Sequence, residues 1–124
     1  MNGVERLYFA LGELVYAVAK SDGAINYEEK NKLHDLVLKE AKCHLYEFNV
    51  SEIIFHIMQK DQLFSVEESY RMAMKEINIC SNYLTEDMKA EFVAVLEKVA
   101  RSFGKYSTEE KALIARFRTE IDQL

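Results

Sequence analysis

Apolar residues recur at steps of three and four positions along most of this chain. Near the amino terminus the recurring residues are Val4, Leu7, Leu11, Leu14, Val15 and Val18. This spacing places them on one face of an α-helix, so we predict an amphipathic helix over about residues 3–20. No segment combines sustained alternation of apolar and polar residues with glycine-marked turns, and we therefore predict no β-strand.

Further helices are predicted from helix-capping residues that precede apolar stripes. A capping box joins a side-chain oxygen to the backbone N–H three positions later, and its spacing occurs at Asn26–Glu29, Ser65–Glu68 and Ser107–Glu110. Ser51 and Thr85 are expected to cap two more helices. The stripes expected to be buried are Leu33, Leu36, Val37 and Ala41; Ile54, Ile57 and Met58; Tyr70, Ala73, Met74 and Ile77; Met88, Phe92, Val95, Leu96 and Val99; and Leu113, Ile114, Phe117 and Ile121. The sequence thus predicts an all-α fold, a compact bundle of about six helices in one domain over residues 1–124.

The segment 18–30 recurs in altered form at 99–111. Each copy is expected to join the end of one helix to the start of the next, so the bundle is predicted to contain two pseudo-symmetric helical halves. The first copy has Asp22 before its glycine, whereas the second has Phe103, which we expect to pack between helices.

The first copy is a candidate metal site. Asp22 to Glu29 resembles the second half of an EF-hand loop, with a glycine turn and a carboxylate in the exiting helix. Val18 and Lys20 stand where the first half would supply oxygen ligands, which excludes a complete calcium loop. Two interpretations remain: Asp22, Glu28 and Glu29 form a weaker divalent-cation site, or they stabilise the positive start of the following helix.

Composition narrows the class of protein. Of the 124 residues 49% are apolar and 30% are charged, which is typical of a globular domain. The net charge of −5 argues against nucleic acid as a partner. No apolar stretch is long enough to span a bilayer, so no direct membrane insertion is expected. Cys43 and Cys80 lack CxxC spacing, and the amino terminus lacks a signal-peptide pattern, so we expect a cytoplasmic protein.

Catalytic motifs are not found. The chain has no glycine-rich phosphate loop, no GxSxG and no HExxH, and His34, His44 and His56 do not have zinc-type spacing with the cysteines. We therefore predict no catalytic residues and no enzyme, with a cysteine-dependent hydrolase or redox enzyme as a minor alternative.

Two groups of large apolar side chains are expected either to fill the core or to bind a partner. The first group, expected to fill the core, is Met58, Met72, Met74 and Met88. The second, expected to be either core or a partner-binding patch, is Tyr46, Phe48, Phe55 and Phe64.

The repeated segment also resembles a known family. The run Ala17–Gly23 followed by Glu28–Lys30, with its second copy, is similar to the TerB-like domain family, as are Val50–Ile54 and Glu67–Tyr70. The resemblance extends from about residue 4 to residue 120 and implies an all-helical fold of two halves. It also implies a role in tellurite or chemical-stress resistance within membrane-associated complexes that sense or bind metal ions. The family has Asp-Gly in the second half as well, where this chain keeps only Gly104.

From these observations we predict a non-enzymatic TerB-like interaction or sensing module of a stress response. Its expected partner is a protein, such as a member of a membrane-associated stress complex. No cofactor is expected other than a divalent cation. The alternative function is a divalent-cation-binding domain that uses Asp22, Glu28 and Glu29.

Overall fold

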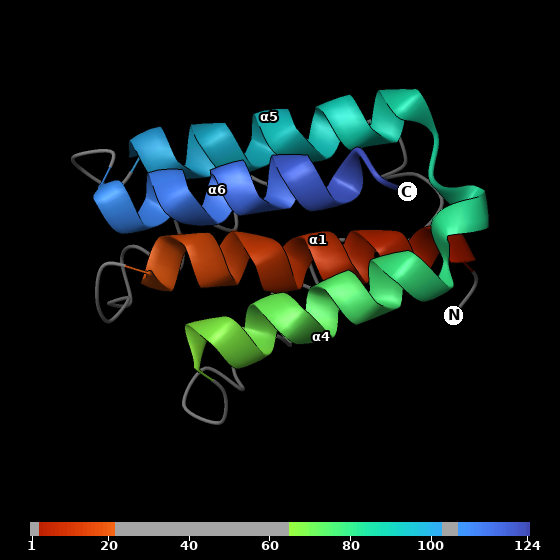
Figure 1. The fold of residues 1–124 in the computed structure, drawn as a ribbon, viewed down its shortest axis with the longest axis horizontal. Helices are drawn as coiled ribbons and strands as arrows, with labels where there is room; N and C mark the ends of the chain where they lie inside the picture. Colours follow the sequence, from red (N-terminus) through yellow and green to blue (C-terminus); the bar gives the residue numbers. More distant parts are fainter. Residues whose placement is uncertain (1–2, 22–64, 103–106) are drawn as a thin grey trace.

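The structure is a computed structural model that describes residues 3–21, 65–102 and 107–124. These residues form α1 (Gly3–Lys20), α4 (Val66–Ile79), the short 3-10 helix η3 (Ser81–Tyr83), α5 (Glu86–Ser102) and α6 (Thr108–Ile121) (Figure 1). No strand occurs among them, which confirms the all-helical prediction for this part of the chain. The helices predicted after Asn26 and Ser51, the aromatic group from Tyr46 to Phe64, and Phe103 lie outside the described residues.

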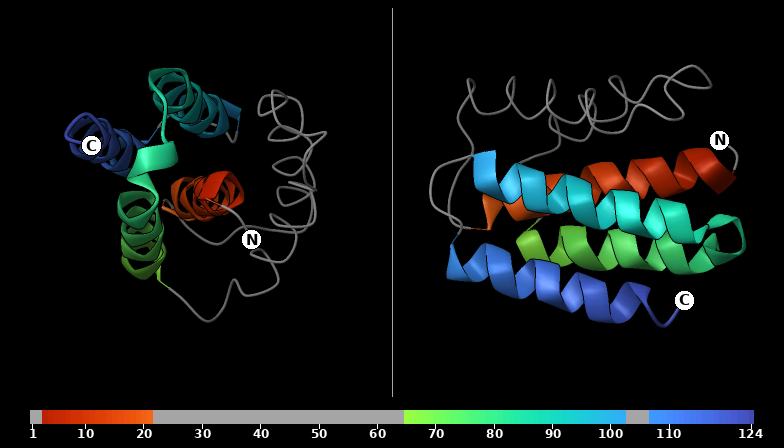
Figure 2. Two further views of the ribbon diagram at one scale, coloured as in Figure 1. Left: turned by 90° about the vertical axis from the view of Figure 1, so that its right-hand side faces the viewer. Right: turned by 90° about the horizontal axis from the view of Figure 1, so that it is seen from above.

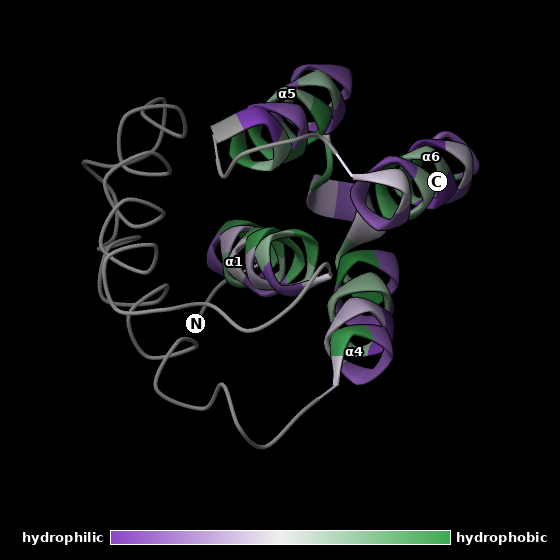
Figure 3. Cartoon of the chain, turned by 90° about the vertical axis from the view of Figure 1, so that its left-hand side faces the viewer, coloured by the Kyte–Doolittle hydropathy of each residue, from purple (hydrophilic) through white to green (hydrophobic). Residues whose placement is uncertain are grey.

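Helix α1 is the common partner of the other described helices. It packs against α4, α5 and α6, and seen end-on it lies inside the curve that those three helices form (Figure 2). Neighbouring helices run in opposite directions, α1 against α4 and α5 against α6 (Figure 1). Hydrophobic residues gather on the inner sides of the helices and hydrophilic ones on the outer sides (Figure 3), as expected for helices that share one core.

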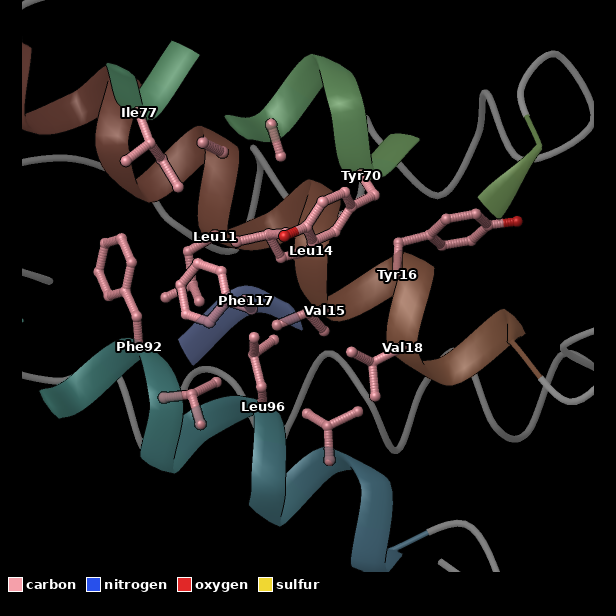
Figure 4. Close-up of a cluster of buried hydrophobic side chains, with 14 of the residues drawn as sticks. Leu11, Leu14, Val15, Tyr16, Val18, Tyr70, Ile77, Phe92, Leu96 and Phe117 are labelled. Atoms are coloured by element: carbon pink, nitrogen blue, oxygen red, sulfur yellow. The ribbon is translucent and has the colours of Figure 1, made fainter. Parts of the chain in front are cut away.

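The core follows the predicted stripes. From α4, α5 and α6 it contains the buried side chains of Tyr70, Ala73, Ile77, Met88, Phe92, Val95, Leu96, Val99, Ile114, Phe117 and Ile121. In Figure 4, Phe117 and Phe92 approach Leu11 of α1 from two different helices. Fully burying a side chain of this size stabilises the fold by about 1.5–3 kcal/mol, so the stripes account for why these helices associate.

Helix α1 is more deeply buried than the predicted single stripe requires. Every residue from Ala10 to Ala19 is buried, including the faces opposite Leu11 and Leu14. The run includes the small residues Ala10, Gly12, Ala17 and Ala19. A helix buried on nearly all sides is the central element of a bundle rather than a surface helix.

The methionines show one error in the sequence prediction. Met88 is buried and Met74 packs against the core, as expected, but Met72 is 42% exposed. Position 72 lies outside the stripe formed by Tyr70, Ala73 and Ile77, so its side chain is not part of the buried core. Cys80 is a free, buried thiol, in agreement with the prediction of a small core residue.

The predicted helix caps are confirmed where the structure describes them. At the start of α6, Glu110 N–H donates to Ser107 Oγ over 3.1 Å, and Ser107 N–H donates to Glu110 Oε1 over 3.0 Å. The equivalent box is present at Ser65 before α4. Thr85 caps α5, because its Oγ1 accepts from Met88 N–H over 3.1 Å.

We expect Ser107→Ala to lower the free energy of unfolding by about 0.5–2 kcal/mol, because alanine lacks the Oγ that accepts from Glu110 N–H. Chemical denaturation measures the change. Thr108→Ala is the matched control: its side chain is exposed one position later, and we expect a change within about 0.5 kcal/mol. Equal losses for the two variants would contradict a capping role.

Candidate functional site

A groove of about 490 Å³ lies between α1 and α4. The residues of α1 that line it are spaced three and four positions apart, which places them on one face of the helix. On α4, Lys75 and Glu76 follow Met72 by three and four positions, and the described lining consists of Arg6, Phe9, Glu13, Met72, Lys75 and Glu76. The groove is therefore a direct product of how α1 and α4 pack.

Glu13 is the unusual residue of the groove. Its side chain belongs to the groove lining but is only 8% exposed, and no hydrogen bond or ion pair joins it to any described residue. Burial disfavours the charged carboxylate, and repulsion from Glu76 adds to this, so that the pKa of Glu13 is raised to about 7. At neutral pH the carboxyl group is thus close to half protonated.

The charged residues around Glu13 lie at the rim. Arg6 Nε is 3.5 Å from Glu76 Oε1, and both side chains are substantially exposed. Such pairs contribute little to stability. Lys75 is also exposed. The two causes of the raised pKa of Glu13 are burial and Glu76, so the rim cations leave the buried acid uncompensated.

The groove also has an apolar wall. Phe9 is partly buried and Met72 is largely exposed, and they face the groove from opposite helices. The site combines a deep acid, an apolar wall and a charged rim, which are the usual components of a recognition surface.

A second charged cluster joins α4 to α6, but its members satisfy one another. Arg116 Nη1 donates to Glu67 Oε2 over 2.7 Å, and the guanidinium lies 4.2 Å from the centre of the Tyr70 ring. Tyr70 O–H donates to Glu120 Oε2 over 2.7 Å. The hydrogen bond from Arg116 lowers the pKa of Glu67, while burial raises the pKa of Tyr70. We interpret this cluster as a structural clamp between the two helices.

The residues that the sequence singled out for metal binding, Asp22, Glu28 and Glu29, lie outside the described residues. Within the described ranges, no group of three or more histidine, cysteine, aspartate or glutamate side chains could hold a metal ion. The sequence reasoning missed Glu13, although one signal was present. Glu13 is the only charged residue between Leu7 and Ala19, and a single acid in such a run indicates either a partner or a function.

The cation hypothesis makes a measurable prediction. If Asp22, Glu28 and Glu29 hold a divalent cation, then calcium, magnesium, zinc or manganese at about 100 times its Kd should add about 2.7 kcal/mol to the free energy of unfolding. Asp22→Ala should abolish that gain and leave the cation-free protein unchanged or slightly stabilised. A loss of about 0.5–2 kcal/mol without cation would instead indicate a capping aspartate. Thermal melts with and without each cation distinguish the two outcomes.

Comparison with known proteins gives no family for the chain. No protein-family model matches it, and no curated protein or solved structure does so. In the part that the structure describes, none of the helices has both the length and the apolar character needed to cross a bilayer. The described residues thus form an all-α bundle, and a buried acid lies in the groove between α1 and α4.

Proposed function

We propose that this chain is a cytoplasmic, non-enzymatic interaction or sensing module of the TerB-like stress-response type, with about six helices in two pseudo-symmetric halves. The observation that carries the interaction role is the α1–α4 groove with Glu13 at its base. The TerB-like assignment rests on the repeated segment at 18–30 and 99–111.

Two features of the groove support binding rather than folding alone. A buried carboxyl group without a partner destabilises a fold, and Glu13 is such a group within the described part of the chain. Met72 exposes a large apolar side chain beside it. A molecule that covered Met72 and placed a cation or a hydrogen-bond donor against Glu13 would offset both costs.

A raised carboxyl pKa also occurs in catalytic acids. The described lining of this groove contains no serine, cysteine, threonine, histidine or tyrosine beside Glu13, and its one amine, Lys75, is exposed at the rim. We therefore base the proposal on recognition.

A matched pair of surface variants tests the proposal. Met72 and Ile79 are both exposed apolar residues of α4, but only Met72 lines the groove. Each chain is immobilised and exposed to a native lysate. The wild-type chain and Ile79→Lys should retain the same partner protein, whereas Met72→Lys should not retain that protein. If no protein is retained reproducibly, or if both variants lose it equally, the interaction role of the groove is wrong.

A further inference from the structure

We propose that the groove between α1 and α4 receives one lysine or arginine side chain from a partner protein, with its cationic head against Glu13 and its aliphatic stem along Phe9 and Met72. This inference rests on the proposed interaction function and names the chemistry of its partner. Three observations carry it: the unpaired acid, the apolar wall and the position of the rim cations.

The charge of the groove is complementary to a single cation. Glu13 and Glu76 are close enough to repel each other, and Arg6 contacts only Glu76 of the two. A cation placed against Glu13 would relieve that repulsion and provide the ion pair that the described residues do not supply. Arg6 and Lys75 at the rim would repel a second cation, so a polybasic segment fits less well than one with a single basic residue.

The number of carboxylates and the volume of the groove favour a peptide segment over a metal ion or a free amine. Two carboxylates are fewer ligands than a hard cation usually takes, and the described residues offer no third. The volume of about 490 Å³ exceeds what one basic side chain fills. The exposed Met72 leaves apolar area for neighbouring residues of the same segment. Lysine and arginine both suit such a site, because their stems are apolar and only their heads are charged.

The proposed binding is linked to pH. A cation pairs with the ionised form of Glu13, and that form is a minority below the pKa of about 7. The other charged groups that line the groove are Arg6 on α1 and Lys75 and Glu76 on α4. Because apparent affinity scales with the population of the competent form, binding should tighten by about tenfold between pH 6 and pH 8.

The test selects random twelve-residue peptides displayed on phage against the full chain at pH 8. In parallel the same library is selected against Glu13→Gln and against Glu109→Gln. Glu109 is an exposed residue of α6, and its replacement changes the net charge by the same amount as Glu13→Gln. We expect peptides enriched on the wild-type chain and on Glu109→Gln, but not on Glu13→Gln, to contain one basic residue flanked by apolar residues. Replacing that residue by citrulline or norleucine should weaken binding at least tenfold, and Met72→Lys should weaken it similarly.

Several outcomes would overturn the inference. They are enrichment of the same peptides on Glu13→Gln, enriched peptides without a basic residue, no enrichment on the wild-type chain, or equal stabilisation of the chain by free arginine amide or spermidine. Circular dichroism of each variant confirms folding, and Met72→Lys provides an exposed site that does not depend on replacing a buried group. If lysate capture depends on Met72 but not on Glu13, then the interaction function stands and only the basic occupant is wrong.

Discussion

Phe117→Ala should lower the free energy of unfolding by about 3–5 kcal/mol. Phe117 is fully buried on α6 and belongs to the core cluster that α1, α4 and α5 share, so truncation leaves a cavity that no single helix can close. The loss is a large part of the 5–15 kcal/mol typical of a domain. Chemical denaturation at constant pH measures it.

Ile79→Ala is the control for this prediction. Ile79 has a side chain of comparable apolar character but is 59% exposed on α4, and its truncation should cost no more than about 0.5 kcal/mol. If both variants lost the same small amount, α6 would not share a cooperative core with the other helices.

Glu13→Gln should change how stability depends on pH. The pKa of Glu13 rises on folding from its ordinary value of 4.5 to about 7, so between these values the folded chain binds a proton that the unfolded chain has released. The stabilisation from that proton is complete below pH 4.5 and is lost as pH rises through 7. Since a tenfold change in proton affinity is worth about 1.4 kcal/mol, the total is about 3 kcal/mol.

The measurement is the difference in the free energy of unfolding between the wild-type chain and Glu13→Gln at pH 5, 6, 7 and 8. The wild-type chain should lose stability relative to the variant across this range and run parallel to it above pH 8. Glu76→Gln should end the loss at lower pH, because removing the repulsion from Glu76 lowers the pKa of Glu13 and makes its ionisation less costly. The total loss in the free energy of unfolding should therefore be smaller for Glu76→Gln, whereas Glu109→Gln should follow the wild-type curve. Parallel curves for the wild-type chain and Glu13→Gln would contradict an uncompensated buried acid.

Local features of this fold could be predicted from the sequence, and features that depend on distant segments could not. The caps at Ser65, Thr85 and Ser107 involve residues three positions apart, and the sequence shows such spacing directly. The clamp between Arg116 and Glu67 joins residues 49 positions apart, and no local pattern indicates it.

The candidate site shows the same limit. The burial of Glu13 depends on how α4 packs against α1, so periodicity along α1 alone did not identify it. Helical spacing predicts Met72 in the core, but its position relative to Tyr70 and Ile77 leaves its side chain 42% exposed. The functional assignment from Asp22, Glu28 and Glu29 stays a prediction.

The central position of α1 has a consequence for synthesis. This helix leaves the ribosome before α4, α5 and α6, and its contact between Tyr8 and Glu91 spans 83 positions. Until those helices emerge, the run from Ala10 to Ala19 lacks the contacts with α4, α5 and α6 that it makes in the finished bundle. Such a nascent helix exposes apolar surface on several sides and is a natural substrate for chaperones. Completion of the described part of the core therefore waits for α6, which follows the other described helices in the sequence.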